Sequence, residues 1–266
     1  MQRTNIKDYL KSLEIKLYNN DLFSKKQIKI LIGGCGTGKE PAEIGELIEN
    51  TEIIAVDISK KSLGYAARQC KEMKINNVNF LHGDILNLQE LNKKFDVVLS
   101  NGVIHHMEDP IKGCKSLLAC LKNKGLLKLS LYSYQARKDL VFYQKIAKTR
   151  NIHTHESVRN FRKEIINNKL EREALIELKD FYNANEFKDL ICNEQEHTFT
   201  IKKIKELLDI CGIKFCGFQN ISNLHEKFIK YYGSSENLHN LDYWEEFEKE
   251  NPKIFIGMYQ FWCQKT

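Results

Sequence analysis

The stretch Ile28–Glu40, IKILIGGCGTGKE, decides the fold of this chain. Its first five residues are mostly apolar, as in a buried strand, and four glycines follow within residues 33–38. Glycines allow a tight turn and let a ligand approach the backbone closely. Apolar residues at Ile44, Leu47 and Ile48 then have the spacing of a helix. The stretch therefore predicts a strand, a glycine turn and a helix whose free N–H groups favour a polar ligand at the turn.

An acidic residue follows this turn at a spacing that suits a nucleoside ligand. Asp57 ends the predicted strand 52–57, EIIAVD, 21 residues after Gly36. A carboxylate at that place can accept hydrogen bonds from both hydroxyls of a ribose. The turn spells neither the GxGxxG of dinucleotide-binding proteins, because Lys39 stands in place of the last glycine, nor a GxxxxGKS/T phosphate loop. A helix-capping role for Asp57 stays open at this point.

Strands and helices alternate in the part of the chain that contains this turn. Two helix starts are marked, one by Ser59 as a cap and one by Asp109 followed by Pro110. The alternation predicts a parallel sheet with right-handed crossovers and helices on both faces. Further strands are predicted at 77–82, 95–100 and 126–132.

The alternation stops after residue 133. Residues 134–198 are charged, mostly helical in pattern and without a strand signal. A helix from Ile201 then ends at Gly212, and two more strands are expected at 213–221 and 254–263. We predict one α/β domain made of an N-terminal region 1–25 with a helix over 4–18, a core 26–133, a helical insertion 134–198 that forms a substrate lid, and a completion of the core at 199–266 with a further insertion 222–252.

The motifs of this core resemble those of the Rossmann-like (class I) S-adenosylmethionine (SAM) methyltransferases. IKILIGGCGTG, VDIS, HGDIL, FDVVLSNGVIHHMEDP and GLLKLSLYS occur in that family's order over residues 28–132. The segments KFCGFQ and FIGMYQFWCQ resemble its closing antiparallel hairpin. The resemblance implies a three-layer α/β sheet of seven strands, the last of them antiparallel, with SAM as the cofactor. Residues 181–218 are similar to a bacterial subgroup often fused to tetratricopeptide repeats, a less specific match.

The same resemblance assigns cofactor contacts to individual positions. Gly34 and Gly36 line the methionine part of SAM, and Cys35 and Thr37 belong to the same turn. In the family pattern an acidic residue two positions before the first glycine of GxG holds the SAM ammonium, but this chain has Ile32 there. The remaining expected contacts are Asp57 with the ribose, Ile58 with the adenine, Asp84 with the adenine amino group and Ile85 beside it, and Asn101 and Gly102 at the methionine end.

Two histidines are candidates for catalysis. His106 is the second histidine of a pair that resembles the HH of small-molecule methyltransferases, in which it faces the substrate. A polar wall without a proton role is the alternative. His197 follows Glu196 and is expected to open the late helix, where the pair acts as a base or as a cap. Arg137 is expected at the surface, with a clamp on a substrate carboxylate as the alternative.

The substrate class follows from what the chain lacks and from its insertions. Residues 100–103, SNGV, lack the proline motif of DNA amino-methyltransferases and a cytosine-directed cysteine, so DNA is not expected. Two lids enclose a small molecule more naturally than a polymer. We therefore expect a small-molecule acceptor. A protein or RNA acceptor, a SAM- or nucleotide-binding module without catalysis, and third a NAD-dependent oxidoreductase are the alternatives.

Composition sets the remaining expectations. The 266 residues carry a net charge of +6 with the charges interspersed, unlike a nucleic-acid-binding tail. No apolar run reaches the roughly 20 residues of a membrane helix, and the start MQRTNIKDYLKS lacks the apolar centre of a signal peptide. Eight cysteines without a CxxC pair favour a reduced, cytoplasmic protein without a metal site. The oligomeric state stays open.

Overall fold

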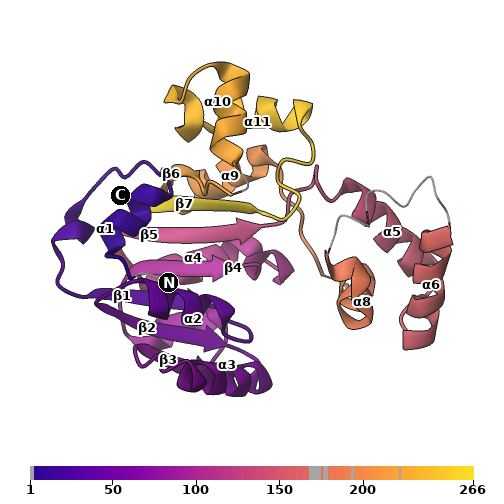
Figure 1. Cartoon of the computed structure of the whole chain (residues 1–266), viewed down its shortest axis with the longest axis horizontal. Coiled ribbons are helices and arrows are strands. Elements are labelled where there is room, and N and C mark those ends of the chain that lie inside the picture. Colours follow the sequence, from indigo (N-terminus) through magenta and orange to yellow (C-terminus); the bar gives the residue numbers. More distant parts are fainter. Residues whose placement is uncertain (1–2, 168–174, 176–178, 193–194, 222) are drawn as a thin grey trace.

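A seven-stranded sheet forms the centre of the computed structural model, which describes residues 3–167, 175, 179–192, 195–221 and 223–266 (Figure 1). The strand order is β3-β2-β1-β4-β5-β7-β6, and β7 runs antiparallel to both of its neighbours. The predicted α/β sheet with an antiparallel last strand is therefore confirmed. The strands are β1 (Ile28–Gly33), β2 (Thr51–Asp57), β3 (Val78–His82), β4 (Phe95–Asn101), β5 (Leu121–Leu131), β6 (Ile213–Phe218) and β7 (Tyr259–Lys265).

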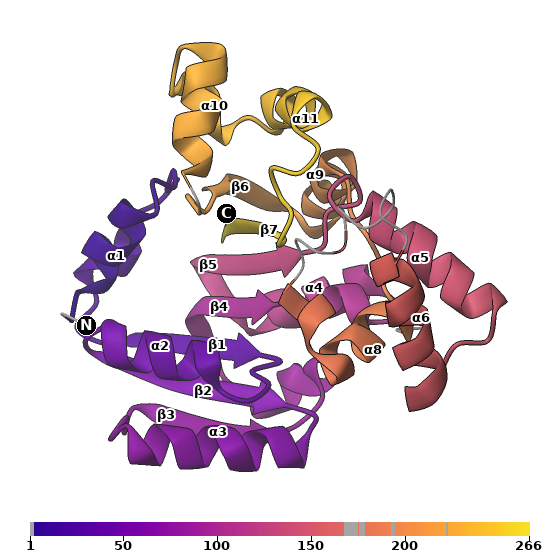
Figure 2. The ribbon, with the colours of Figure 1, turned by 45° about the vertical axis from the view of Figure 1, so that its right-hand side comes forward.

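Helices cover both faces of the sheet (Figure 2). Ile30 and Ile32 of β1 pack with apolar residues of α1, α2 and α3, whereas Leu31 packs with residues of α4 and α9 on the other face. Burial on both sides explains why this strand is an uninterrupted apolar run rather than an alternating one. The helices are α1 (Ile6–Ser12), α2 (Lys39–Leu47), α3 (Lys60–Glu72), α4 (Pro110–Cys120), α5 (Lys138–Thr149), α6 (His155–Asn167), α8 (Ala184–Cys192), α9 (Ile201–Cys211), α10 (Leu224–Tyr232) and α11 (Leu241–Glu250), with short 3-10 turns at η1 (Asp21–Ser24), η2 (Ile85–Leu91), η3 (Ile104–His106), η4 (Lys179–Tyr182) and η5 (Glu236–His239).

Short-range signals placed the helix ends correctly. The Ser59 hydroxyl accepts a hydrogen bond from the Ser62 amide at the start of α3. Asp109 caps α4 and Pro110 is its first residue. Gly212 ends α9 with a left-handed φ of 64°. Each cap needs only its own neighbours in the chain, so the sequence was sufficient to find it.

Several predicted boundaries were wrong. The N-terminal helix ends at Ser12 instead of residue 18, because Glu14 has a left-handed φ of 54° that no helix can continue. The last strand begins at Tyr259 instead of residue 254, because the Ile254 and Ile256 amides make turn bonds to Asn251 and Lys253 at 2.9 and 3.1 Å. The two strands beside it also differ from the prediction: β6 ends at residue 218 instead of 221, and β5 begins at residue 121 instead of 126.

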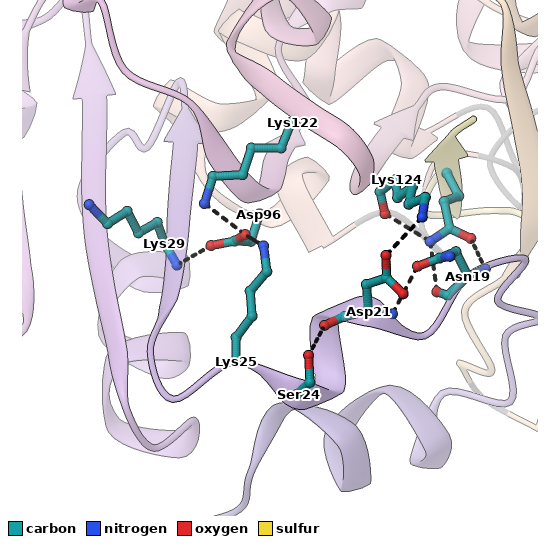
Figure 3. A network of polar contacts seen from close by, with 9 residues as sticks. Asn19, Asp21, Ser24, Lys25, Lys29, Asp96, Lys122 and Lys124 are labelled. Carbon is teal, nitrogen blue, oxygen red and sulfur yellow. Dashed lines mark hydrogen bonds and ion pairs between the residues drawn. The ribbon is translucent and has the colours of Figure 1, made fainter.

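A buried carboxylate accepts several hydrogen bonds at the amino ends of the parallel strands (Figure 3). Asp96 of β4 has only 1% of its surface exposed. It accepts hydrogen bonds from the Lys29 amide and from the Lys122 ammonium, both at 2.9 Å, and from the Lys25 ammonium. Burial raises the pKa of Asp96, but the hydrogen bonds from Lys25 and Lys122 outweigh it and hold the pKa below its usual value. The site described next lies at the opposite edge.

The insertion builds a hydrophobic core of its own. Figures 1 and 2 show α5, α6 and α8 grouped beyond the carboxyl ends of the parallel strands. The base of the insertion is closed by the Tyr134 amide, which donates to the Phe199 carbonyl at 2.7 Å. The buried residues of this separate core are Leu140, Tyr143, Ala147, Val158, Phe161, Ile165, Leu175, Phe181, Phe187, Leu190 and Ile191.

Candidate cofactor and substrate site

The glycine turn after β1 needs its glycines for two different reasons. Gly34, Gly36 and Gly38 all have left-handed φ values, of 77°, 52° and 90°. A Cβ on Gly34 would lie 2.4 Å from the Val103 side chain, and one on Gly38 would lie 2.5 Å from Ala66. No atom comes within 4 Å of a Cβ on Gly36. Packing therefore requires two of these glycines, while Gly36 faces open space in which a ligand can approach the backbone.

Asp57 joins the end of β2 to this turn. Its carboxylate accepts hydrogen bonds from the Gly36 amide at 2.7 Å and from the Ser59 amide at 2.8 Å. The cap of α3 is Ser59. A carboxylate has about four acceptor positions, so Asp57 can hold the turn and still accept bonds from a ligand.

The other adenosine-side candidates follow β2 and β3, which the Gly83 amide connects by donating to the Asp57 carbonyl at 3.1 Å. Ile58 is 69% exposed, which is unusual for a large apolar side chain next to a buried strand. Asp84 accepts from the Leu86 amide at 2.9 Å. Ile85 is buried in the core beneath the turn. Of the remaining turn residues, Cys35 is buried and Thr37 is exposed.

A charged network that the sequence reasoning missed lies at the end of β4. Asn101 donates to Glu40 of α2 through its side-chain amide and accepts a hydrogen bond from the Ser130 hydroxyl. The Lys128 ammonium lies 3.5 Å from the Glu40 carboxylate, and both side chains are largely buried. Burial raises the pKa of Glu40, and Lys128 opposes that shift in part. The one available signal was a lysine inside the apolar strand LLKLSL.

Ile32 lies on the same face of the sheet as this network but is fully buried among apolar residues. It therefore offers nothing to an ammonium group. Glu40 is the carboxylate that reaches Asn101 on this face.

The histidine pair packs against an aromatic ring and a buried ion pair. The Nε2 atoms of His105 and His106 lie 3.1 Å apart, and the His105 ring lies 4.0 Å from the Tyr132 ring, centroid to centroid. The Arg137 guanidinium stacks on the Tyr132 ring, with its central carbon 3.5 Å from the ring centroid. Burial, together with the charges of His106 and Arg137, lowers the pKa of His105 to about 3. His105 is therefore a neutral imidazole at physiological pH.

Two predictions about this region were wrong. Arg137 is 4% exposed rather than at the surface, and it forms a bidentate pair with Glu196 at 3.1 and 3.3 Å. A residue so engaged is not available to clamp a substrate carboxylate. His197 does not open the late helix, because Thr200 caps α9 and Ile201 begins it. Its side chain is exposed and lines a separate cavity of about 310 Å³ beside the start of α4.

His106 contacts groups at both of its ring nitrogens. Nε2 faces His105, and Nδ1 lies 3.4 Å from the Gln195 carbonyl. A carbonyl only accepts, so the contact at Nδ1 is a hydrogen bond only in the tautomer that carries its proton there, in which Nε2 would accept from His105. Accepting a proton from a substrate at Nε2 would require this contact to His105 to open.

Comparison with known proteins agrees with this geometry. Residues 24–212, most of the chain, match a family model described as a methyltransferase domain. The chain therefore belongs to the class I SAM-dependent methyltransferases, whose Rossmann-like sheet it shares. SAM is the cofactor of this family. The alternative of a NAD-dependent oxidoreductase is thus wrong.

The individual relatives are distant. The chain is 26% identical over 247 residues to an uncharacterized Synechococcus protein, covering 85% of this chain and 58% of that one. It is 32% identical over 128 residues to a malonyl-[acyl-carrier protein] O-methyltransferase of Acetivibrio thermocellus, covering 48% and 44%. The structure of PKMT2 from Rickettsia typhi in complex with AdoHcy has a TM-score of 0.64 at 18% identity, covering 90% of this chain and 48% of that one. The chain thus spans about half the length of the curated relatives it matches, and the structural likeness concerns the fold.

The described residues contain neither a membrane-spanning helix nor a cluster of metal ligands. None of their helices is both long and apolar enough to cross a membrane. No three His, Cys, Asp or Glu side chains among them gather as metal ligands would. All eight cysteines are free thiols.

Proposed function

We propose that this protein transfers the methyl group of SAM to a small-molecule acceptor. The observation that carries the choice of methyl donor is the pairing of Asp57 with the glycine turn, 2.7 Å from the Gly36 amide, in front of open space. The choice of a small acceptor is supported by the helices α5, α6 and α8 beyond the carboxyl ends of the parallel strands (Figures 1 and 2). A turn whose backbone is accessible, with a carboxylate beside it, is the arrangement a nucleoside requires.

The adenosine half of the cofactor fits the ends of β2 and β3. Asp57 would accept both ribose hydroxyls, and the exposed Ile58 side chain would cover one face of the adenine. Asp84 keeps acceptor capacity beyond its bond to the Leu86 amide, so it would accept from the adenine amino group. Ile85 would support the ring from the core side.

The methionine half fits the end of β4. Gly36 leaves the backbone accessible beside it, and Asn101 is held by Glu40 and Ser130. We assign the ammonium of the cofactor to Glu40 together with Asn101, because Ile32 carries no charge and is buried. In this assignment the carboxylate that holds the ammonium, Glu40, belongs to the first turn of α2 and not to β1.

The chemistry is an in-line displacement. SAM supplies a methyl group on a sulfonium, so the protein contributes mainly by positioning the acceptor atom behind it. His106 would face the acceptor from η3, whereas His105 is neutral and fixes the orientation of His106. We assign no proton transfer to His197, since its side chain lines the cavity beside α4. The helices α5, α6 and α8 would act as the substrate lid.

Formation of S-adenosylhomocysteine (SAH) tests this proposal. The protein is incubated with SAM and a pool of small metabolites, in parallel with the variant Asp57→Ala. We expect SAH formation that depends on the pool and is lost in the variant. SAH formation with purified protein or RNA fractions, and none with small metabolites, would instead establish a macromolecular acceptor. Binding of SAM without turnover on any fraction would favour a module without catalysis.

A further inference from the structure

A cleft of about 760 Å³ opens where β7 begins. It lies between the end of β6, the first turns of α10 and the turn segment 251–258. Its volume is in the range of pockets that bind small molecules. The insertion 222–252 contributes four of the thirteen lining residues, the turn segment 253–258 contributes six, and none comes from the insertion 134–198.

A row of polar residues connects the cleft to the proposed methyl-donor site. Asn101 of β4 is in register with Ser130 of β5, and Ser130 is in register with Gln260 of β7. The Gln219 amide then donates to the Gln260 carbonyl at 2.8 Å. Neighbouring strands are about 4.8 Å apart, so Gln260 stands roughly 10 Å from Asn101, a distance that one small molecule can span.

Met258 makes the second connection. It lines the cleft, and its Cε atom lies 3.5 Å from the position of a Cβ on Gly102. Gly102 directly follows β4 at the methionine end of the proposed cofactor site. The cleft therefore begins where the cofactor site ends.

The lining of the cleft indicates the chemistry of its ligand. Most of the thirteen lining residues are apolar, two are the lysines Lys227 and Lys253, and none is a carboxylate. The side-chain oxygen of Gln219, Oε1, is buried and has no hydrogen-bond partner among the residues that the structure describes. A buried acceptor of this kind is costly unless a ligand or water satisfies it. The walls thus complement an apolar body, a negative charge and an O–H or N–H donor.

We propose that this cleft binds the methyl acceptor, and that the acceptor is a small organic anion with an apolar body and one O–H or N–H group. The proposal rests on the proposed methyltransferase function and names its substrate class. Lys227 and Lys253 hold the anion, Gln219 accepts from the donor group, and Met258 guides the molecule toward Gly102.

The test uses hydroxylated carboxylates with apolar bodies, namely hydroxydecanoate and hydroxyphenylacetate, each beside its neutral primary amide. Their binding to the full chain saturated with SAH is measured by calorimetry. We expect at least one acid to bind about tenfold more tightly than its amide, with affinity that falls as salt is added. Lys227→Ala should weaken that acid about fivefold, because one charge-assisted contact is lost.

Lys230→Ala is the matched control. Lys230 is exposed on the same helix, one turn from Lys227, but does not line the cleft. It should leave the affinity unchanged. Gln219→Leu should weaken the acid without lowering the melting temperature, because it removes an unpartnered polar group. Equal binding of acids and amides, no binding of either, or equal effects of the two lysine variants would overturn the proposal. SAM affinity, measured in the same variants, should not change, so a failure of cofactor binding is distinguished from a failure of the cleft.

Discussion

Replacing Asp57 by alanine distinguishes two roles for this residue, binding of the cofactor and stabilisation of the fold. If the carboxylate accepts two ribose hydroxyls, each charge-assisted hydrogen bond contributes roughly 1.5–3 kcal/mol. Because about 1.4 kcal/mol corresponds to a factor of ten in Kd, Asp57→Ala should weaken SAM binding about 100-fold or more. Calorimetry with SAM gives this number directly.

The same substitution must also destabilise the fold. Asp57 accepts from the Gly36 and Ser59 amides at 2.7 and 2.8 Å. The loss of such cap-like bonds costs about 0.5–2 kcal/mol, and in a protein of this size 1 kcal/mol lowers Tm by about 2–4 °C. We therefore expect Tm to fall by roughly 1–8 °C, with a cooperative unfolding transition retained.

Asp109→Ala is the control for this effect. Asp109 also accepts from two backbone amides, those of Ile111 and Lys112 at 2.9 and 3.0 Å, at the start of α4. It should lower Tm by a similar amount and leave the Kd for SAM unchanged. If Asp57→Ala matched Asp109→Ala in both measurements, Asp57 would be a structural residue and the assignment of the ribose site would be refuted.

Three further predictions concern buried titratable side chains. Glu40→Gln should weaken SAM about tenfold or more but leave adenosine binding unchanged, because only SAM carries the ammonium; equal losses for both ligands would contradict the assignment. The folded-state pKa of Asp96 lies below its unfolded value of 3.8. The ionised side chain therefore stabilises the folded protein above pH 3.8, and this stabilisation is lost as the pH falls through the folded-state pKa. Urea unfolding should accordingly show Asp96→Asn less stable than the native chain by about 1–3 kcal/mol at neutral pH, with the difference shrinking in acid; a constant difference would argue against the shift. The pKa of His105 lies near 3, so its imidazole NMR signals should not titrate between pH 8 and 5, and acidification below the unfolded value of 6.5 should cost stability that His105→Gln does not lose; a signal titrating near 6.5 would show that His105 is accessible to water.

The parts of the fold that the sequence predicted correctly depend on neighbouring residues. The apolar run of β1, the Ser59 and Asp109 caps and the Gly212 helix end are short-range signals, and all appear in the structure. The seven-stranded sheet with an antiparallel last strand followed from the family resemblance and from the alternation of strands and helices. Within these elements, sequence reasoning was sufficient.

The errors arose where distant residues decide the outcome. Glu40 and Lys128 are 88 positions apart and meet only because the fold brings the first turn of α2 within reach of the Lys128 side chain of β5. Arg137 was expected at the surface because its ion-pair partner, Glu196, lies 59 positions later in the sequence. The early end of α1 is set by the backbone at Glu14, and no glycine or proline marks it in the sequence.

Sequence reasoning likewise found some of the candidate site residues and missed others. The motif positions Gly34, Asp57, Asp84 and Asn101 were identified from the sequence, and the structure brings their elements to one edge of the sheet. Glu40, which we propose as the ammonium ligand in place of Ile32, could not be identified from the sequence, because a carboxylate on the next helix has no fixed spacing from the strand.

Calorimetric titration of the full chain with SAM and with NAD shows which nucleotide the glycine turn and Asp57 hold. We expect micromolar binding of SAM, competition by SAH, and no heat of binding with NAD. Binding of NAD with none of SAM would show that the glycine turn and Asp57 serve a different nucleotide, and would contradict the cofactor site described here.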